Sequence, residues 1–245
     1  MATDPRKKKY KVTRKRSSKG PSGRIPGLSI LYEDRDILVV NKAAGLLTIA
    51  TDDVRSRTAY FLLTDYVRKG VAKSRERVYI VHRLDRETSG VLVFARTAAA
   101  KQQLQENWDT AEKAYVAVVH GHLGEMEGEI RTYLAENAAL RVYTTGDTRR
   151  GRLACTGYCV RHTCGDCSVL DVQLLTGRKH QIRVHLADLG HPILGDRKYG
   201  KAEDPHKMLA LHARSLTISH PHNGERMCFT APEPPHIARW MRVDR

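Results

Sequence analysis

Runs of hydrophobic residues divide the chain into short strands and helices. Residues 28–42 (LSILYEDRDILVVNK) contain two apolar, β-branched runs separated by charged residues at 34–36, which predicts a hairpin. Residues 91–95 (VLVFA) form a continuous apolar run of strand length, and we expect a buried strand there. Residues 112–121 combine alternation with β-branched residues, and this pattern predicts a further strand.

Apolar residues at helical spacing predict helices between these strands. Residues 58–69 are followed by Gly70, and residues 180–189 by Gly190, a residue type that commonly ends helices. Residues 97–109 are rich in Ala, Gln and Leu, which favour a helix. The side chains expected to pack the first and last of these helices are Tyr60, Phe61, Leu63, Val67, Ile182, Leu186 and Leu189. Weaker patterns predict strands near 129–134, 140–143 and 209–219 and a short helix near 237–241.

A hairpin is predicted over residues 152–175, and four of the five cysteines lie in it, at Cys155, Cys159, Cys164 and Cys167. A zinc site is one hypothesis, because Cys164 and Cys167 at a turn have the spacing of a zinc knuckle. Cys155 and Cys159 would lie about 13 Å apart along an extended strand, which is too far for both to bind one ion. We therefore expect unpaired thiols and no metal.

Positive charge is concentrated at the start of the chain. The formal net charge is +15, and residues 1–24 hold ten Lys and Arg against one Asp, which is +9 and leaves +6 for the rest. This segment has almost no apolar side chains, so we expect a disordered basic arm that contacts phosphates, with a solubilising tail as the alternative. A membrane-surface role is disfavoured because the segment has no apolar face.

Composition narrows the class of protein further. No apolar run approaches the length of a membrane span, and no apolar segment follows the basic N-terminus as it would in a secretory signal. Five cysteines, an odd number, fit a reducing compartment better than a disulfide framework. We therefore expect a cytoplasmic location.

The chain's most distinctive stretch is residues 81–96, VHRLDRETSGVLVFAR. It places charged residues directly before a buried strand, where they are costly unless they are paired or functional. Asp85 lies between Arg83 and Arg86, so we expect an ionised carboxylate at neutral pH. The alternative from composition alone is a surface loop with a local ion pair.

Residues 82–90 resemble the H-R-L-D-x-x-T-S-G signature of the RluA-type RNA pseudouridine synthases. Two further segments resemble that family in the same order: residues 112–121 (EKAYVAVVHG) and residues 177–200 (GRKHQIRVHLADLGHPILGDRKYG). Residues 41–46 resemble its N-K-P-x-G-L segment, with Ala43 where the family usually has proline. Three separate motifs in order are much more specific than one short match.

The resemblance implies roles for individual residues. Asp85 is the essential carboxylate, Arg183 pairs with it, and Tyr115 stacks on the target base. Arg83 helps to fill the space that the flipped base leaves. The residues expected to line the substrate site are Arg83, His82, Lys113 and, more weakly, Leu211. Whether Asp85 attacks as a nucleophile or removes a sugar proton stays open.

The resemblance also implies the fold, the partner and the cofactor requirement. It covers residues 28–240 and implies one α+β catalytic domain over 25–245, with a central mixed, mostly antiparallel sheet flanked by helices and loops. Only about 24 residues precede it, so we expect a short form without an S4 RNA-binding domain. The implied partner is a stem-loop of rRNA or tRNA, the expected state is a monomer, and no cofactor is expected because the reaction is an isomerisation.

Two other functional classes compete with this one. An RNA-binding protein without catalysis fits the charge, but it has no need of the set formed by Asp85, Tyr115 and Arg183. A metal-dependent nuclease is suggested by twelve histidines. However, His180 and His185 would lie about 140° apart around a helix, whereas two ligands on one helix face need a spacing of four.

Overall fold

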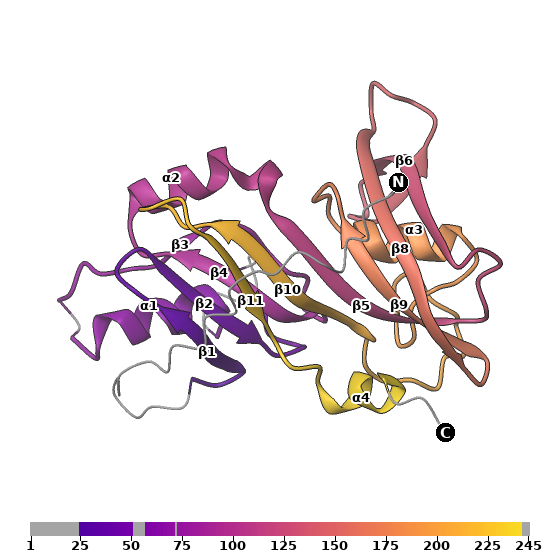
Figure 1. Ribbon diagram of the computed structural model, residues 1–245, viewed down its shortest axis with the longest axis horizontal. Helices are drawn as coiled ribbons and strands as arrows, with labels where there is room; N and C mark the ends of the chain where they lie inside the picture. Colours follow the sequence, from indigo (N-terminus) through magenta and orange to yellow (C-terminus); the bar gives the residue numbers. More distant parts are fainter. Residues whose placement is uncertain (1–24, 51–56, 72, 242–245) are drawn as a thin grey trace.

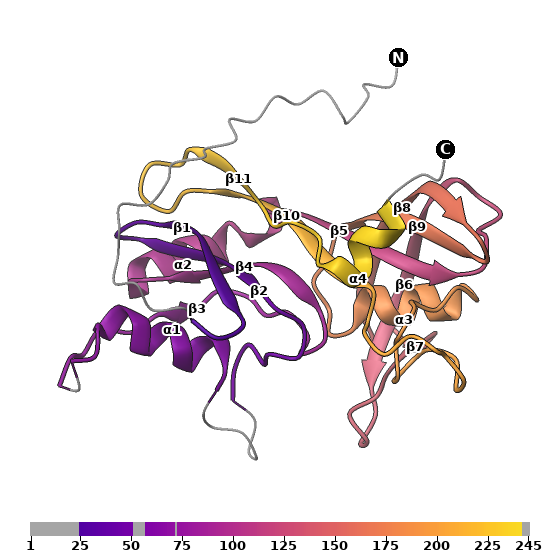
Figure 2. The same cartoon turned by 90° about the horizontal axis from the view of Figure 1, so that it is seen from below.

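A single sheet of eleven strands runs through the described part of the protein (Figures 1 and 2). The structure is a computed structural model, and it describes residues 25–50, 57–71 and 73–241; the arm expected over residues 1–24 lies outside them. The strands are β1 (Leu28–Glu33), β2 (Ile37–Lys42), β3 (Tyr79–Ile80), β4 (Ser89–Ala95), β5 (Glu112–His120), β6 (Glu127–Glu136), β7 (Val142–Thr145), β8 (Arg152–Cys164), β9 (Cys167–Leu174), β10 (Leu211–Ser219) and β11 (Arg226–Thr230).

The strand order is β1-β2-β4-β10-β5-β9-β8-β6-β7, with β11 beside β10 and β3 beside β4. In Figures 1 and 2 the strands β1–β4 lie at one end of the molecule and β6–β9 at the other, with β5 and β10 between them. Among the described strands, only β4 and β10 pair in parallel. The expected α+β fold with a mixed, mostly antiparallel sheet is confirmed.

The parallel pairing of β4 with β10 depends on a glycine. Gly90 lies opposite Ala213 and has a φ of 118°. A Cβ at this position would lie 2.2 Å from the Ala213 carbonyl oxygen, so no other residue fits without moving the backbone. This close approach brings the two halves of the sheet together directly after the loop that contains Asp85.

The helices lie close to the positions that apolar spacing and residue types predict. They are α1 (Ala59–Arg68), α2 (Ala98–Glu106), α3 (Gln181–Asp188) and α4 (Pro235–Ala238), with short 3-10 turns η2 (Trp108–Thr110) and η3 (Arg239–Met241). The Thr58 and Thr97 hydroxyls cap α1 and α2 by accepting hydrogen bonds from the third backbone N–H after them. Helix α1 lies against the β1–β4 half, and α3 contacts β7 and β8 of the other half.

Two packing predictions are wrong. Phe61 is 49% exposed and Leu189 is 43% exposed, although Leu63 and Leu186 of the same helices are buried. Phe61 is two positions from Leu63, which turns it about 200° around the helix and away from the buried face. Leu189 follows the last residue of α3, where the helix ends. The second weak strand, predicted near 140–143, lies at Val142–Thr145 instead.

Buried side chains fill both faces of the sheet. All seven residues of β4 are buried, as the continuous apolar run predicts. The larger cluster spans β2, β4, β5 and β9, and a second one joins β4 and β10 with β11 and α2.

Within the described residues, no helix is both long and apolar enough to cross a lipid bilayer.

Candidate active site

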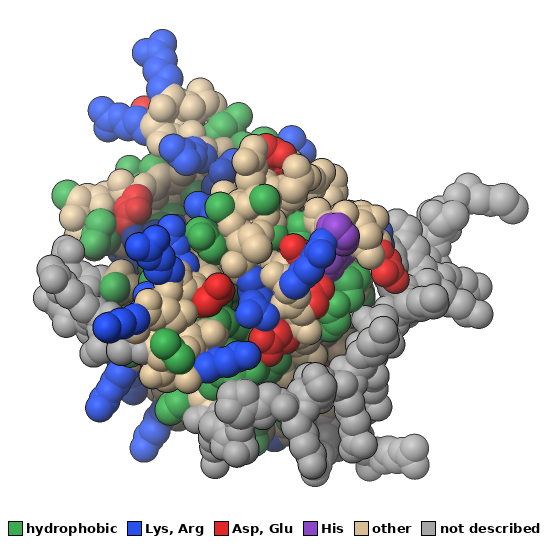
Figure 3. Space-filling view, turned by 90° about the vertical axis from the view of Figure 1, so that its left-hand side faces the viewer, with side chains coloured by type: hydrophobic (Ala, Val, Ile, Leu, Met, Phe, Trp, Pro, Cys, Tyr) green, Lys and Arg blue, Asp and Glu red, His purple; other side chains and the backbone are tan. Residues whose placement is uncertain are grey.

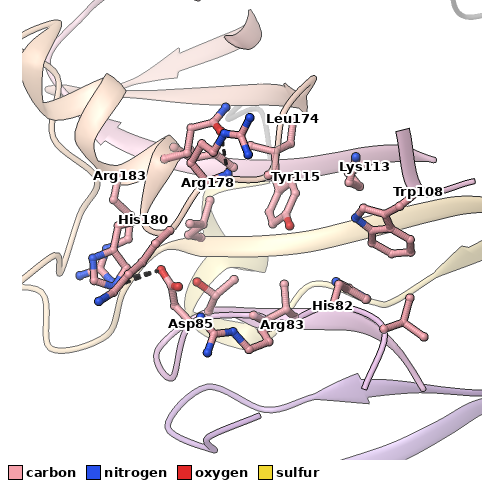
Figure 4. A pocket seen from close by; sticks show the side chains of 18 of the residues that line it. His82, Arg83, Asp85, Trp108, Lys113, Tyr115, Leu174, Arg178, His180 and Arg183 are labelled. Atoms are coloured by element: carbon pink, nitrogen blue, oxygen red, sulfur yellow. Dashed lines mark hydrogen bonds and ion pairs between the residues drawn. The ribbon is translucent and has the colours of Figure 1, made fainter. Parts of the chain in front are cut away.

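A cleft of about 460 Å³ lies between the 81–88 loop, β5 and α3 (Figure 4). Its volume is within the range of ligand pockets, about 300–1,000 Å³. Asp85, Arg183 and His180 lie at one end, Trp108 lies at the other, and Tyr115 stands between them. Segments far apart in the sequence therefore converge on one small space.

The loop that carries Asp85 is held in place through its backbone. The Thr48 hydroxyl donates to the Leu84 carbonyl at 2.8 Å, and the Leu84 N–H donates back at 3.2 Å. On the other side of Asp85, the Arg86 carbonyl accepts from the Gly45 N–H at 2.8 Å. The segment 42–48 therefore clamps both neighbours of Asp85, which fixes the direction of its side chain.

Lys42 forms part of this clamp. Its side chain is fully buried, and Nζ donates to the carbonyls of Ala43, Leu46 and Arg86 at 3.1, 2.8 and 3.1 Å. Three acceptors match the three donors of an ammonium group. Burial lowers the pKa of Lys42 to about 8, although the charge of Asp85 opposes this. Lys42 is therefore still charged at pH 7.

Arg183 joins two carboxylates. Its Nη1 lies 3.3 Å from Asp85 Oδ2, while its Nε and Nη2 each lie 2.8 Å from the Asp196 carboxylate. The Arg183 side chain is 5% exposed, that of Asp196 1% and that of Asp85 25%. Asp196 thus holds the buried guanidinium, and the part-exposed Asp85 faces the cleft.

The electrostatics of this group follow from burial and pairing. Burial disfavours the charged guanidinium, but the hydrogen bonds and charge of Asp196, together with the charge of Asp85, raise the pKa of Arg183 above its ordinary value. Burial also opposes ionisation of Asp196, but Arg183 and the backbone N–H groups of Lys198 and Tyr199 lower its pKa. Arg183 therefore brings a permanent positive charge to Asp85.

His180 approaches the same carboxylate oxygen of Asp85 as Arg183 does. Its Nε2 lies 3.9 Å from Asp85 Oδ2, and its Nδ1 is 2.7 Å from the Tyr199 hydroxyl. Burial is the main cause that lowers the pKa of His180, so the ring is neutral at pH 7. The Tyr199 ring also lies 5.3 Å from the Arg183 guanidinium carbon, a cation–π contact. Tyr199 therefore supports two neighbours of Asp85.

Tyr115 forms the middle of the cleft. Its side chain is largely buried, and its hydroxyl points into the cavity (Figure 4). Burial, and to a lesser degree the charge of Asp85, raise the pKa of Tyr115, so the phenol stays protonated. Leu211 of β10 also lines the cavity, and it gives this part an apolar wall.

The far end of the cleft is aromatic. The His82 ring lies 4.7 Å from the Trp108 ring, and its Nε2 accepts a hydrogen bond from the Val93 N–H at 3.2 Å. Burial, with the charge of Lys113, lowers the pKa of His82 to about 3, which leaves the ring neutral. Lys113 Nζ lies 5.6 Å from the Trp108 ring centroid. This end therefore offers stacking surfaces and one cation.

A second, more basic cleft adjoins the first and shares His180 and Arg183 with it. Its other cationic residues are Arg86, Arg141, Arg197, Lys198 and Lys207. On the face seen in Figure 3, by contrast, Lys and Arg side chains are spread among hydrophobic and acidic ones. The gathering of cations beside Asp85 is suited to an anionic polymer.

All seven residues singled out in the sequence line the first cleft: His82, Arg83, Asp85, Lys113, Tyr115, Arg183 and Leu211. The ion pair between Asp85 and Arg183 is present as expected. Sequence reasoning missed Trp108 and His180 in the wall and the supporting residues Lys42, Asp196 and Tyr199. Asp196 and Tyr199 lie inside the third motif, so the sequence pointed to these two residues, but no role was assigned to them.

The ion-pair partners of Asp85 do not come from its sequence neighbours Arg83 and Arg86. Among the described residues, its ion-pair contacts within 4.0 Å are with Arg183 and His180. The Arg86 side chain turns away and its Nε donates to the Gly45 carbonyl at 3.3 Å. Tertiary contacts, rather than sequence proximity, supply the positive partner.

Possible metal ligands lie away from this cleft. Among the described residues, groups of three close ligand atoms occur at His120, Asp204 and His206, and at Asp34, Asp36 and His220. The four cysteines of the β8–β9 hairpin are free thiols and belong to neither group. Cys155 is buried whereas Cys159 is exposed, so these two do not face a common ion.

Comparison with known proteins gives concordant matches. The sequence profile described as RNA pseudouridylate synthase matches residues 36–188. The dual-specificity RNA pseudouridine synthase RluA of Escherichia coli K12 is 38% identical over 212 residues, which cover 84% of this chain and 94% of that protein. The uncharacterized RNA pseudouridine synthase YjbO of Bacillus subtilis 168 is 36% identical over 219 residues, which cover 88% and 76%.

Solved structures agree with the sequence matches. Human RNA pseudouridylate synthase domain containing 1 superposes with a TM-score of 0.70 at 30% identity and covers 89% of each chain. Human RNA pseudouridylate synthase domain containing 4 gives a TM-score of 0.71 at 26% identity and covers 85% of this chain and 90% of its own. The likeness therefore extends over most of the fold.

Proposed function

The chain belongs to the RNA pseudouridylate synthase family, and we propose that its Asp85 cleft converts a flipped-out uridine of a structured RNA into pseudouridine. The protein is an isomerase. In the reaction the N1–C1′ bond breaks, the uracil turns, a C5–C1′ bond forms, C5 loses its proton and N1 gains one. Reactants and products have the same atoms and oxidation state, so the chemistry itself calls for no cofactor.

One observation supports this proposal most strongly: Asp85 is a part-exposed carboxylate whose Oδ2 lies 3.3 Å from a buried, permanently charged guanidinium. An ionised carboxylate at this place can attack C1′ of the ribose or remove a proton from the sugar. Both roles need the negative charge, and Arg183 stabilises it. A glycosidic bond is reachable here only if the nucleotide leaves its stack.

The remaining walls fit a uracil. Tyr115 presents its ring in the middle of the cleft, where it can stack on the base and hold it while it turns. Leu211 adds apolar contact on the β10 side. Arg83 is exposed at the mouth and can enter the gap that the flipped base leaves. Lys113 and His82 lie deeper and can meet the polar edge of the base.

The basic second cleft gives a path for the RNA backbone. Arg141, Lys198 and Lys207 line it next to Arg183. Phosphates bound there would direct the flipped nucleotide toward Asp85 and make the affinity strongly dependent on salt. The proposed substrate is a stem-loop of rRNA or tRNA, because a loop presents its bases unstacked. The proposed catalytic unit is residues 25–245, acting as a cytoplasmic monomer.

A pseudouridine map tests this function. Wild-type protein and Asp85→Asn are incubated with unmodified total RNA, and new pseudouridines are located by carbodiimide-dependent primer-extension stops. Asp65→Asn, the same change at an exposed position of α1, is the matched control. We expect stops with wild type and Asp65→Asn only. Residual Asp85→Asn turnover within tenfold of wild type would refute the role of Asp85, and RNA binding without any stops would indicate a non-catalytic binder.

A further inference from the structure

We propose that His120, Asp204 and His206 form a binding site for a divalent metal ion of the zinc class, separate from the Asp85 cleft. Each residue offers one ligand atom, and the three atoms all lie within 4.8 Å of one another. His120 ends β5, whereas Asp204 and His206 belong to the connection between α3 and β10. The site would therefore join two segments that are far apart in the sequence.

The distances suit a shared ion after a small adjustment. His120 Nε2 lies 2.8 Å from Asp204 Oδ2, and His206 Nδ1 lies 2.7 Å from Asp204 Oδ1. Ligands of a tetrahedral zinc ion with bonds near 2.0 Å are about 3.3 Å apart. The two imidazoles would thus move away from the carboxylate by about half an ångström each. Their ligand nitrogens, which lie within 4.8 Å of each other, would also turn toward a common ion.

The carboxylate is already oriented by the backbone. Asp204 Oδ2 accepts from the Gly195 N–H at 2.7 Å, and Oδ1 accepts from the His206 N–H at 2.8 Å. Each carboxylate oxygen has two lone pairs, so once the imidazoles turn from the carboxylate to the ion, each oxygen has one lone pair left for a metal. Hydrogen bonds of this kind fix the direction of metal-binding carboxylates. The side chains of His120, Asp204 and His206 are 13%, 6% and 22% exposed, which limits competition from water.

A cysteine is paired with one member of this group, although its Sγ is outside the 4.8 Å limit that the three ligand atoms meet. Cys167 of β9 is paired directly with His120 of β5, and Cys164 of β8 is paired with Cys167. Residues opposite one another on adjacent strands project to the same face of the sheet. Cys167 is therefore the candidate for the fourth ligand.

The ligand chemistry selects the class of ion. Two imidazoles, a carboxylate and a thiol suit zinc and cobalt, whereas magnesium and calcium prefer oxygen ligands only. Bound metal would brace the segment that begins at Gly195, whose neighbour Asp196 holds Arg183. The proposed role is thus to stabilise the connection behind the active site, without a part in the reaction.

Metal analysis of the full-length protein tests the proposal. The protein is purified without a histidine tag or chelator, and its zinc content is measured by plasma mass spectrometry. Metal-free protein is then titrated with cobalt while the visible and near-ultraviolet spectra are recorded. We expect about one zinc per chain, saturation at one cobalt per chain, and a sulfur-to-cobalt charge-transfer band that disappears in Cys167→Ser. A band that persists in Cys167→Ser would overturn the assignment of the fourth ligand.

Single substitutions distinguish a metal site from a network of hydrogen bonds. Asp204→Asn keeps the shape of the side chain and His206→Ala removes one ligand, so both should lose zinc and the rise in melting temperature that zinc gives metal-free protein. His122→Ala is the matched control, because this exposed histidine follows the same strand and bonds only to the Gly165 carbonyl among the contacts described. The proposal would be overturned if the wild-type protein held only background zinc and gave no cobalt spectrum at one cobalt per chain. The three residues would then form only a network of hydrogen bonds.

Discussion

Asp196 binds Arg183 through two hydrogen bonds of 2.8 Å, and it is the closer of the two carboxylates that share this guanidinium. Asp85 is the other carboxylate, with one contact of 3.3 Å. The planar fork of Arg183 is therefore oriented by Asp196, and only its outer nitrogen reaches toward the cleft. Among the contacts of the described residues, Arg183 and His180 both approach Oδ2 of Asp85, which leaves Oδ1 for the substrate.

Replacing Asp196 by Asn should reduce activity, because Asp196 holds Arg183 in place beside Asp85. Only one of the two terminal atoms of the amide is an acceptor, and the amide carries no charge, so the two-oxygen contact with the guanidinium is lost. Arg183 then loses its fixed orientation and stays buried with less compensation. Removing one partner of a buried ion pair costs about 3–5 kcal/mol of stability. Rate measurements on the substrate RNA should show kcat reduced at least tenfold with KM changed much less, since Asp196 does not line the first cleft.

Glu87→Gln is the matched control for this experiment. Glu87 Oε2 lies 4.0 Å from Arg183 Nη1, and its side chain is 52% exposed. Loss of this charge leaves both Asp196 contacts in place, so turnover and stability should remain within twofold and about 0.5 kcal/mol of wild type. An equal effect of the two substitutions would contradict the special position of Asp196.

Local pattern predicts much of this architecture, but not the support behind Asp85. The buried strand β4 could be predicted because VLVFA is a continuous apolar run of strand length. Helices α1 and α2 could be predicted from the spacing of apolar residues and from residue types that favour helices. Arg183 lies 98 residues from Asp85, and only the family resemblance joined the two. Asp196 and Lys42 act through tertiary hydrogen bonds to Arg183 and to backbone carbonyls. Such contacts have no sequence period, so pattern alone could not reveal them.

Two substitutions of Tyr115 distinguish a stacking role of its ring from a chemical role of its hydroxyl. Tyr115→Phe keeps the ring and should keep kcat/KM within tenfold of wild type. Tyr115→Ala removes a stacking contact worth about 1–3 kcal/mol, so kcat/KM should fall by about 5- to 150-fold. Single-turnover kinetics on one substrate RNA measures both variants. If Phe and Ala are equally inactive, the phenol itself takes part in proton transfer and the stacking role is insufficient.

Lys42→Met tests the clamp beneath the catalytic loop. Methionine fills a similar volume but removes the ammonium donor from the carbonyls of Ala43, Leu46 and Arg86. The Arg86 carbonyl keeps its bond from the Gly45 N–H. Hydrogen bonds to a charged group contribute about 1.5–3 kcal/mol, so urea unfolding should show a loss of about 3 kcal/mol together with reduced turnover. Lys73→Met, at an exposed position, should change neither. Full stability in Lys42→Met would mean that the loop is held by its other contacts.

Residues 1–24 should contribute affinity without chemistry. They carry ten basic residues against one acidic residue. Their deletion should weaken RNA binding and make the logarithm of the binding constant fall less steeply with the logarithm of salt concentration, by about 0.7 for each lost phosphate contact to single-stranded RNA. Filter binding at several salt concentrations gives this slope, and single-turnover rates at saturating protein should not change. An unaltered slope would reduce the segment to a solubilising tail.

The buried His185 should make the stability of the protein depend on pH. Its side chain is fully buried between the hydroxyls of Thr132 and Thr156, and burial lowers its pKa to about 4. Below pH 6.5 the unfolded chain binds a proton at this histidine that the native protein does not bind until about pH 4. The free energy of unfolding should therefore decrease on acidification through this range, by up to about 1.4 kcal/mol per pH unit from His185 alone.

Replacing His185 by Gln should remove this part of the pH dependence, because glutamine can hydrogen-bond to both hydroxyls but does not titrate. Urea unfolding at pH 7.5, 6.5 and 5.5 should give a slope that is smaller than that of wild type by about 1 kcal/mol per pH unit. If His185→Gln keeps the wild-type slope, the acid sensitivity arises elsewhere, and His82, whose pKa burial lowers to about 3, becomes the next group to replace.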